Sequence, residues 1–177
     1  MNSRLKIIIP FAAILIVVGG GAGIYKAIKS TPQKTEIIVP PAIAVAIPAI
    51  SQGVTVEQSF VTNLSHLSEV SFYAATYLRK NLPGSGTFQL LNTDKTVLVS
   101  QNFPLSALKD NSYFTLRFKS LHLTPGSQYF VTLTSSAKSS IAIFTLWSNQ
   151  GFQNNSFVLR ENGKTLKGSA IFNLTGN

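Results

Sequence analysis

The sequence predicts a mainly β protein: a two-sheet antiparallel sandwich of jelly-roll type, preceded by one N-terminal transmembrane α-helix. Residues 7–25 carry no charged side chain, which is typical of a membrane-spanning helix. After Ser51 the chain consists of short alternating or β-branched runs separated by turn residues, without helical periodicity of useful length. A chain of 177 residues has room for one such domain beside an anchor.

Residues 1–29 are predicted to form a short tail and the transmembrane helix. At about 1.5 Å per residue, the uncharged run matches the hydrocarbon thickness of a bilayer. A cleaved signal peptide is the alternative, because the basic start and the small residues after the apolar run also suit one. Gly19 and Gly23 form a GxxxG pair, which either admits a second helix at close range or loosens the end of this one.

The distribution of charge favours a membrane protein over a nucleic-acid-binding protein. The net charge is +9, and more than half of the excess precedes the first acidic residue, Glu36. Basic residues beside an apolar segment meet lipid headgroups. We therefore expect a single-pass protein whose C-terminal domain is extracytoplasmic, in the periplasm or outside the cell, and no nucleic-acid partner.

Residues 30–50 form an apolar linker that contains prolines. A free tether is normally polar, whereas residues 37–50 read IIVPPAIAVAIPAI. One interpretation is a strip that docks on a partner protein or on the membrane surface. The alternative is that Ala42–Ile47 is an edge strand of the sandwich, with prolines at its ends. The residues predicted to dock are Ile37, Ile38, Val39, Ile43, Val45 and Ile47.

Residues 51–177 are predicted to form the sandwich, with one short helical turn at residues 105–109. Turn residues such as Pro83, Gly84, Asn162 and Gly163 separate the expected strands. The expected strands are Val54–Val61, Glu69–Leu78, Thr87–Leu91, Thr96–Phe103, Tyr113–Phe118, Gln128–Thr134, Ile141–Trp147, Phe157–Arg160 and Ser169–Leu174.

Several of these runs together resemble a known family. The segments EVSFYAATYLRKN, DNSYFTLRF, GSQYFVTLTS, and TLWSN followed by ENGKTLKGSAIFNL resemble a bacterial carbohydrate-binding-module-like (galactose-binding-like) sandwich over most of residues 54–174. The resemblance implies a jelly roll outside the cytoplasm, in proteins connected with envelope polysaccharides. It supplies no set of ligand-contacting residues, because the fold hosts binders of glycans, proteins and lipids alike.

The sequence offers few groups for catalysis or metal binding. It contains two histidines, six carboxylates and no cysteine. His66 and His122 lack the spacing that places two imidazoles on one metal, and Asp94 and Asp110 lack the acidic clustering that calcium requires. Nucleotide-binding and nucleophile motifs are missing. We therefore expect no enzyme activity, no cofactor and no metal.

Aromatic residues are the better candidates for a binding surface. Strand alternation over residues 69–79 places Tyr73, Tyr77 and Arg79 on one amphipathic face. The alternative is that the tyrosines complete the core with their hydroxyls at its rim. Trp147 ends an apolar strand and is expected in the core or in an interface.

Two functions fit these features. In the first, the protein is an accessory subunit: its helix packs against integral-membrane subunits and its sandwich braces their outer face. A photosynthetic or other bioenergetic complex is one setting, although the chain has no haem, chlorophyll or iron-sulfur ligand pattern. In the second, the protein is a membrane-anchored carbohydrate-binding module for envelope polysaccharide. The expected partners are membrane proteins and lipid, with glycan under the second hypothesis.

Overall fold

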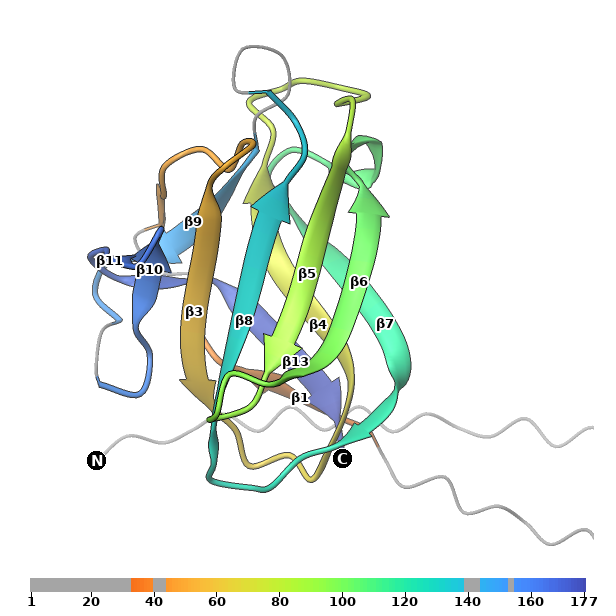
Figure 1. Cartoon of the computed structure of the whole chain (residues 1–177), viewed down its shortest axis with the longest axis vertical. Coiled ribbons are helices and arrows are strands. Elements are labelled where there is room, and N and C mark those ends of the chain that lie inside the picture. The colour runs from red at the N-terminus through yellow and green to blue at the C-terminus, as the bar shows by residue number, and fades with distance from the viewer. Residues whose placement is uncertain (1–32, 40–43, 139–143, 153–154) are drawn as a thin grey trace, which may run out of the picture.

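Two antiparallel β-sheets pack face to face in the computed structural model, which describes residues 33–39, 44–138, 144–152 and 155–177 (Figure 1). All strand pairs of these residues are antiparallel, as predicted. The seven-stranded sheet contains β1 (Lys34–Ile37), β2 (Ala44–Ala46), β4 (His66–Ala75), β7 (Ser112–His122), β9 (Thr145–Asn149), β12 (Ser169–Ala170) and β13 (Phe172–Gly176). The six-stranded sheet contains β3 (Thr55–Val61), β5 (Ser85–Leu91), β6 (Val97–Pro104), β8 (Gln128–Ser135), β10 (Leu159–Glu161) and β11 (Lys164–Thr165).

The two sheets are organised differently. The six-stranded sheet is a simple series in the order β11-β10-β3-β8-β5-β6. The other sheet is built around β4, which pairs with β7 along one edge and with β13 and then β9 along the other. Strand β4 therefore holds the seven-stranded sheet together.

Alternation of side chains along the strands creates the core between the sheets. On β4, Val70, Phe72 and Ala74 are buried, whereas Ser71 and Tyr73 are partly exposed on the outer face. Phenylalanines from both sheets fill the interior, and burying each contributes about 2 to 3 kcal/mol relative to exposure. The fully buried ones are Phe60, Phe88, Phe144 and Phe172.

The segment before Ser51 is part of the sandwich wherever the structure describes it. Strand β1 pairs with β13, and β2 pairs with β9. The strand alternative for this segment is thus what the structure shows, with β2 covering residues 44–46. Ile38, Val39 and Ile47 are at most 5% exposed, so these three residues of the predicted docking strip are covered by the protein's own core.

The predicted transmembrane helix and the pair Gly19 and Gly23 lie outside the described residues, and so does Ile43. Within the described ranges, no helix has the length and apolarity needed to cross a bilayer. One 3₁₀ helix, η1 (Leu105–Ala107), is present where a short helical turn was expected.

Most of the expected strands match the observed ones within a few residues, but β11 was not expected, and residues 141–143 of the strand expected at 141–147 lie outside the described residues. Two other expected strands end or divide differently. The strand predicted to run to residue 78 ends at Ala75, because Tyr77 and Leu78 have positive φ angles of 55° and 62°. The strand predicted over residues 169–174 is divided at Ile171 into β12 and β13. The first part pairs with β9 and the second with β4.

The sandwich has two distinct ends. Lys34 pairs with Gly176, and Gly176 pairs with Leu67. We call this the proximal end, because the N-terminal segment joins the sandwich here. From His66 to Ala75, β4 runs about 30 Å at the usual rise per residue and reaches the opposite, distal end, which lies at the top of Figure 1.

Candidate functional site

The three residues predicted to form a binding face lie near the distal end, but not on one face of a strand. Tyr73 projects from the outer face of β4, where its ring centroid lies 5.1 Å from that of Tyr113 on β7. Tyr77 and Arg79 follow the end of β4, in a turn. Because the strand stops at Ala75, period-two alternation does not apply to these two residues.

The turn at Thr76–Arg79 is strained and presents large apolar side chains. The Arg79 amide donates to the Thr76 carbonyl over 3.1 Å, and both central residues have positive φ, as in a type I′ turn. Such turns favour Asn-Gly, whereas a bulky residue in this conformation costs about 1 to 2 kcal/mol. Nevertheless Tyr77 is 50% and Leu78 84% exposed.

A buried polar clamp fixes this turn. The Thr76 amide donates to Asp110 Oδ1 over 2.6 Å, and the Thr76 hydroxyl donates to the Arg79 carbonyl over 2.9 Å. Thr76 is fully buried. The clamp connects the turn to the segment before β7, and it holds the Tyr77 and Leu78 side chains outward.

Tyr113 extends the aromatic surface beyond the predicted residues. Its side chain is exposed. Partial burial raises the pKa of the Tyr113 hydroxyl, a hydrogen bond with Asn173 lowers it, and the neighbouring Tyr73 raises it further. Trp147 lies on β9 and is partly exposed, with Nε1 donating to Asn111 Oδ1 over 2.9 Å.

Aromatic, apolar and basic side chains near the distal end form a surface that we call the distal patch. It combines apolar or aromatic side chains with exposed cations from neighbouring segments, a composition suited to interfaces with proteins, glycans or lipid headgroups. Sequence reasoning found Tyr73, Tyr77 and Arg79 of this set; its other members follow from the turn and from the pairing of β4 with β7. The distal patch comprises Tyr73, Tyr77, Leu78, Arg79, Lys80, Lys109 and Tyr113.

Of the predicted docking strip, two described residues are accessible. Ile37 is 58% exposed on β1 and Val45 is 43% exposed on β2. Both belong to the seven-stranded sheet. The described part of the strip therefore divides between core residues and two exposed aliphatic side chains.

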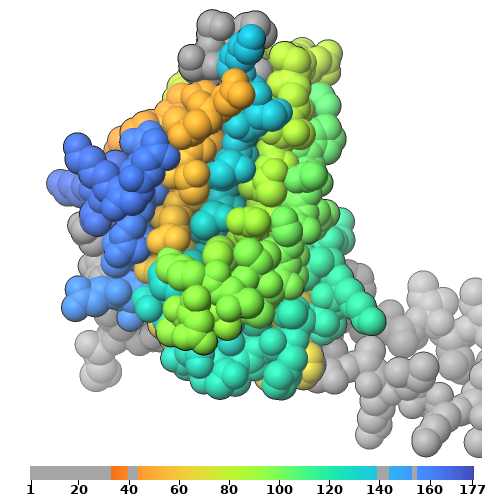
Figure 2. Space-filling model, viewed as in Figure 1, coloured from red at the N-terminus to blue at the C-terminus, as the bar shows by residue number. Residues whose placement is uncertain are grey.

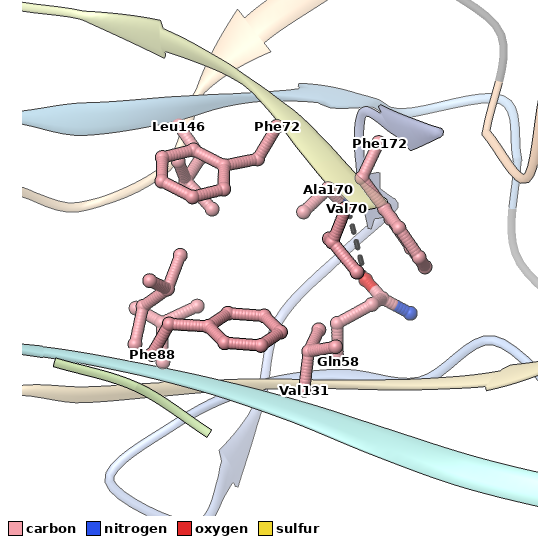
Figure 3. Close-up of a pocket in the computed structure, with 10 residues that line it drawn as sticks. Gln58, Val70, Phe72, Phe88, Val131, Leu146, Ala170 and Phe172 are labelled. Atoms are coloured by element: carbon pink, nitrogen blue, oxygen red, sulfur yellow. Dashed lines mark hydrogen bonds between the residues drawn. The ribbon is translucent and has the colours of Figure 1, made fainter. Parts of the chain in front are cut away.

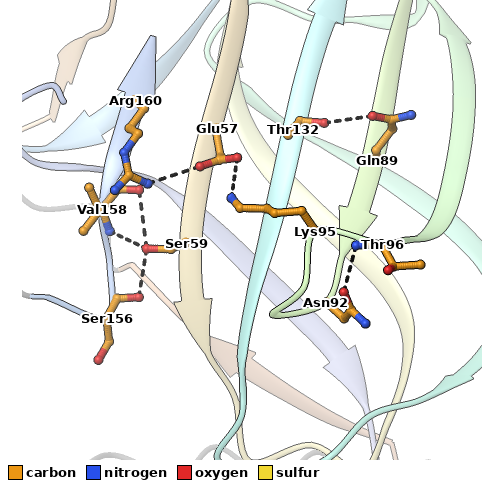
Figure 4. A network of polar contacts seen from close by, with 10 residues as sticks. All are labelled: Glu57, Ser59, Gln89, Asn92, Lys95, Thr96, Thr132, Ser156, Val158 and Arg160. Atoms are coloured by element: carbon orange, nitrogen blue, oxygen red, sulfur yellow. Dashed lines mark hydrogen bonds and ion pairs between the residues drawn. The ribbon is translucent and has the colours of Figure 1, made fainter. Parts of the chain in front are cut away.

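The outer face of the six-stranded sheet is polar. Strands β3, β8, β5 and β6 lie side by side on the face shown in Figure 2. Glu57 forms ion pairs with Lys95 at 2.6 Å and Arg160 at 3.2 Å (Figure 4), and Lys95 Nζ lies 3.0 Å from the centroid of the Phe130 ring. These residues line an open depression of about 600 Å³.

The two histidines that the sequence separates are brought together. His66 and His122 face each other across β4 and β7, with 3.5 Å between Nε2 of His66 and Nδ1 of His122. The Ser65 hydroxyl also lies 3.2 Å from His66 Nδ1. Within the part of the chain that the structure describes, no third metal-ligating side chain joins a cluster.

The void between the two sheets, as formed by the described residues, is too small for a ligand. A void of about 20 Å³ lies between the sheets and is lined by apolar side chains such as Phe72 and Phe88 (Figure 3). This volume is close to that of one water molecule, and a buried water needs polar partners. The polar lining residue, Gln58, already accepts from the Ala170 amide and donates to the Ser59 carbonyl.

Comparison with models of known protein families finds no match, and a search of curated proteins finds no match either. The β-sandwich is therefore established by the structure, whereas the resemblance to carbohydrate-binding modules stays a prediction.

Proposed function

We propose that this chain is a non-catalytic, single-pass membrane protein whose extracytoplasmic sandwich serves as an accessory subunit of a larger integral-membrane complex. In this proposal the N-terminal segment is the anchor. The sandwich contacts the partner subunits through the outer side of its seven-stranded sheet.

The observation that carries this proposal is the sidedness of the exposed apolar residues. Six large hydrophobic residues are exposed among the described residues: three lie on strands of the seven-stranded sheet, one lies on the six-stranded sheet, and two lie in the turn after β4. Protein interfaces are enriched in aromatic side chains at their centres and depleted in charge. The three on the seven-stranded sheet are Ile37, Val45 and Tyr113; Val97 lies on β6, and Tyr77 and Leu78 lie in the turn.

Purification of the full chain in mild detergent, followed by mass spectrometry, tests this proposal. We expect membrane subunits in fixed stoichiometry with the chain. The variants Ile37→Asp and Tyr113→Asp place a charge in the proposed interface and should reduce co-purification about tenfold, since a desolvated unpaired charge is costly. Val97→Asp is the matched control, because it adds the same charge to an exposed residue of the other sheet. A wild-type chain that purifies alone would contradict the proposal.

A membrane-anchored carbohydrate-binding module is the second candidate, and the tyrosine pair favours it. The rings of Tyr73 and Tyr113 lie at 46° to each other, and the Asn173 side-chain amide hydrogen-bonds to the Tyr113 hydroxyl. Aromatic faces beside amide groups suit the stacking and hydrogen bonding of sugars. Under this proposal the full chain binds a polysaccharide array, Tyr113→Ala loses binding, and Val97→Ala retains it. Equal binding by both variants would exclude the tyrosine pair as the sugar site.

A further inference from the structure

We propose that the turn Thr76–Arg79 inserts into an anionic lipid surface, with Tyr77 and Leu78 entering the headgroup region and nearby cations contacting phosphates. The proposal concerns a contact at the distal end, apart from the predicted N-terminal anchor, and it needs no protein partner. It rests on the exposure of the turn, its fixed geometry, its surrounding charge and its position in the fold.

The side chains of Tyr77 and Leu78, which we call the apolar tip, are too exposed to belong to the sandwich core. Leu78 has the largest exposed fraction, 84%, among the large hydrophobic residues of the described chain, and Tyr77 adds a half-exposed ring. Exposed apolar groups of this kind mark contact sites. A tyrosine beside an aliphatic residue suits the boundary between headgroups and acyl chains, where an aromatic ring with a polar end is favoured.

The turn presents these side chains at low entropic cost on binding. Its backbone is closed by the hydrogen bond from Arg79 to Thr76 and clamped through Thr76 to Asp110. A preformed contact element loses little conformational freedom when it binds. Two bulky residues in the left-handed backbone region raise the energy of the free protein. This local strain falls on the two residues that protrude, Tyr77 and Leu78.

The charge around the tip is positive. Arg79 and Lys80 follow directly in the chain, and Lys109 precedes the clamping residue Asp110; all three basic side chains are exposed. Asp110 itself accepts hydrogen bonds from the Thr76 amide and from Asn111 Nδ2. Basic side chains near an anionic leaflet strengthen binding electrostatically.

The remaining carboxylates lie elsewhere. Glu36 hydrogen-bonds at the proximal end of β3, and Asp94 lies in the turn after β5 at that same end. The other three lie on strands: Glu57 and Glu69 form ion pairs, and Glu161 lies on β10 of the six-stranded sheet, in register with Lys164. The distal tip is therefore complementary to a negative surface.

Lipid fits this surface better than a protein partner does. A stable protein interface buries about 800 Å² on each partner, whereas the protruding tip consists of two side chains flanked by cations. Insertion of a small apolar element combined with charge attraction is sufficient for peripheral membrane contact. The turn also lies about 30 Å from the proximal end, along β4. It can therefore contact a lipid surface other than the one beside the proximal end.

A unique fluorescent probe can test the insertion. The chain has no cysteine, so Leu78→Cys allows labelling of one site with an environment-sensitive dye. The full chain is placed in phosphatidylcholine nanodiscs and mixed with vesicles of phosphatidylcholine, with or without phosphatidylglycerol. We expect a blue shift and about a twofold rise in emission with the anionic vesicles alone. The same dye at Ser120→Cys, an exposed residue of β7 toward the proximal end, should not respond.

A second variant separates lipid contact from folding. The double substitution Tyr77→Asn with Leu78→Gly places the residues that a type I′ turn prefers, so it should raise the melting temperature of the sandwich while removing the apolar tip. Capture of anionic vesicles by this variant should fall about tenfold relative to wild type. Arg79→Ala with Lys80→Ala should also weaken capture, and high salt should weaken capture by wild type.

The proposal would be overturned by an unchanged signal from the probe at residue 78, by an equal response to neutral vesicles, or by undiminished vesicle capture by the variant that combines Tyr77→Asn with Leu78→Gly. A Leu78 probe that responds to partner membrane proteins but not to protein-free anionic vesicles would also overturn it, and would assign the turn to a protein interface.

Discussion

The two sheets of the sandwich share one core but differ in what they expose. The outer face of the six-stranded sheet carries charged and polar groups that pair with one another, such as Glu57 with Lys95 and Arg160. The seven-stranded sheet also carries an ion pair, Glu69 with Arg117, but among the described residues it exposes more large hydrophobic side chains, namely Ile37, Val45 and Tyr113 against Val97 on the other sheet. The core needs both inner faces to be apolar, whereas it places no such demand on the outer faces. The difference between the outer faces therefore points to contact on the seven-stranded side.

Truncation of a buried phenylalanine should lower stability equally on the two inner faces, and these substitutions have the largest effect that we expect. Phe72 from the seven-stranded sheet and Phe88 from the six-stranded sheet are both at most 2% exposed and line the same void. Phe72→Ala and Phe88→Ala should each lower the free energy of unfolding by about 3 to 5 kcal/mol. Chemical denaturation of the full chain measures this. A loss at one site less than half of that at the other would break the equivalence of the inner faces.

A polar link between the sheets should matter less than the phenylalanines but more than any surface contact. Gln58 of β3 is 2% exposed, and its Oε1 accepts a hydrogen bond of 2.9 Å from the Ala170 amide of β12. Gln58→Leu leaves that buried amide without a partner and should cost about 2 kcal/mol in unfolding free energy. Gln89→Leu is the control, because Gln89 lies on the outer face and makes a 3.4 Å contact with Thr132. Equal losses would show that the Gln58 link adds nothing to stability.

The ion pairs of the six-stranded face should contribute little. Glu57→Gln removes both pairs, whose cationic side chains are 45% and 35% exposed, so we expect a loss below about 1 kcal/mol that shrinks at high salt. Glu69→Gln on the other sheet breaks the pair with Arg117, which is 74% exposed, and should cost less still. Thermal unfolding at low and high salt distinguishes them. A large, salt-independent loss of unfolding free energy for Glu57→Gln would show that its ion pairs stabilise the fold more than exposed pairs normally do.

The smallest expected effect is a pH dependence of the tyrosine pair. Partial burial raises the pKa of Tyr113 above its ordinary value of 10.0, with Tyr73 adding to the shift and Asn173 opposing it. Because the folded protein holds this proton more tightly than the unfolded chain does, the stabilisation is complete below pH 10 and is lost as the pH rises through the folded-state pKa. Unfolding measured across this range should show a weaker alkaline decline for Tyr113→Phe than for wild type. Identical profiles would contradict the assigned burial effect.

Much of the fold was predictable, because strands with one buried face leave a period-two pattern. The runs around Val70 to Ala74 and Phe88 to Leu90 show that pattern, and both are strands with buried inner faces. The strand end at Ala75 was not predictable in this way. The segment TYLRK contains no glycine, asparagine or proline, which are the usual signals of a tight turn, so periodicity continued the strand through Leu78.

The candidate site was predicted in part. Tyr73, Tyr77 and Arg79 were identified from strand alternation, and they do lie near one end of the sandwich. Tyr113 was missed because its proximity to Tyr73 depends on the register between β4 and β7, which joins segments 40 residues apart in the chain. His66 and His122 meet through the same pairing.

The sequence by itself determined the β class of the domain and most strand positions, because these depend on local periodicity and composition. Tertiary structure alone decided that Ile38, Val39 and Ile47 belong to the core, which side chains meet across strands, and where Leu78 points. Those properties depend on strand register and on contacts between distant segments, and a one-dimensional pattern does not specify them.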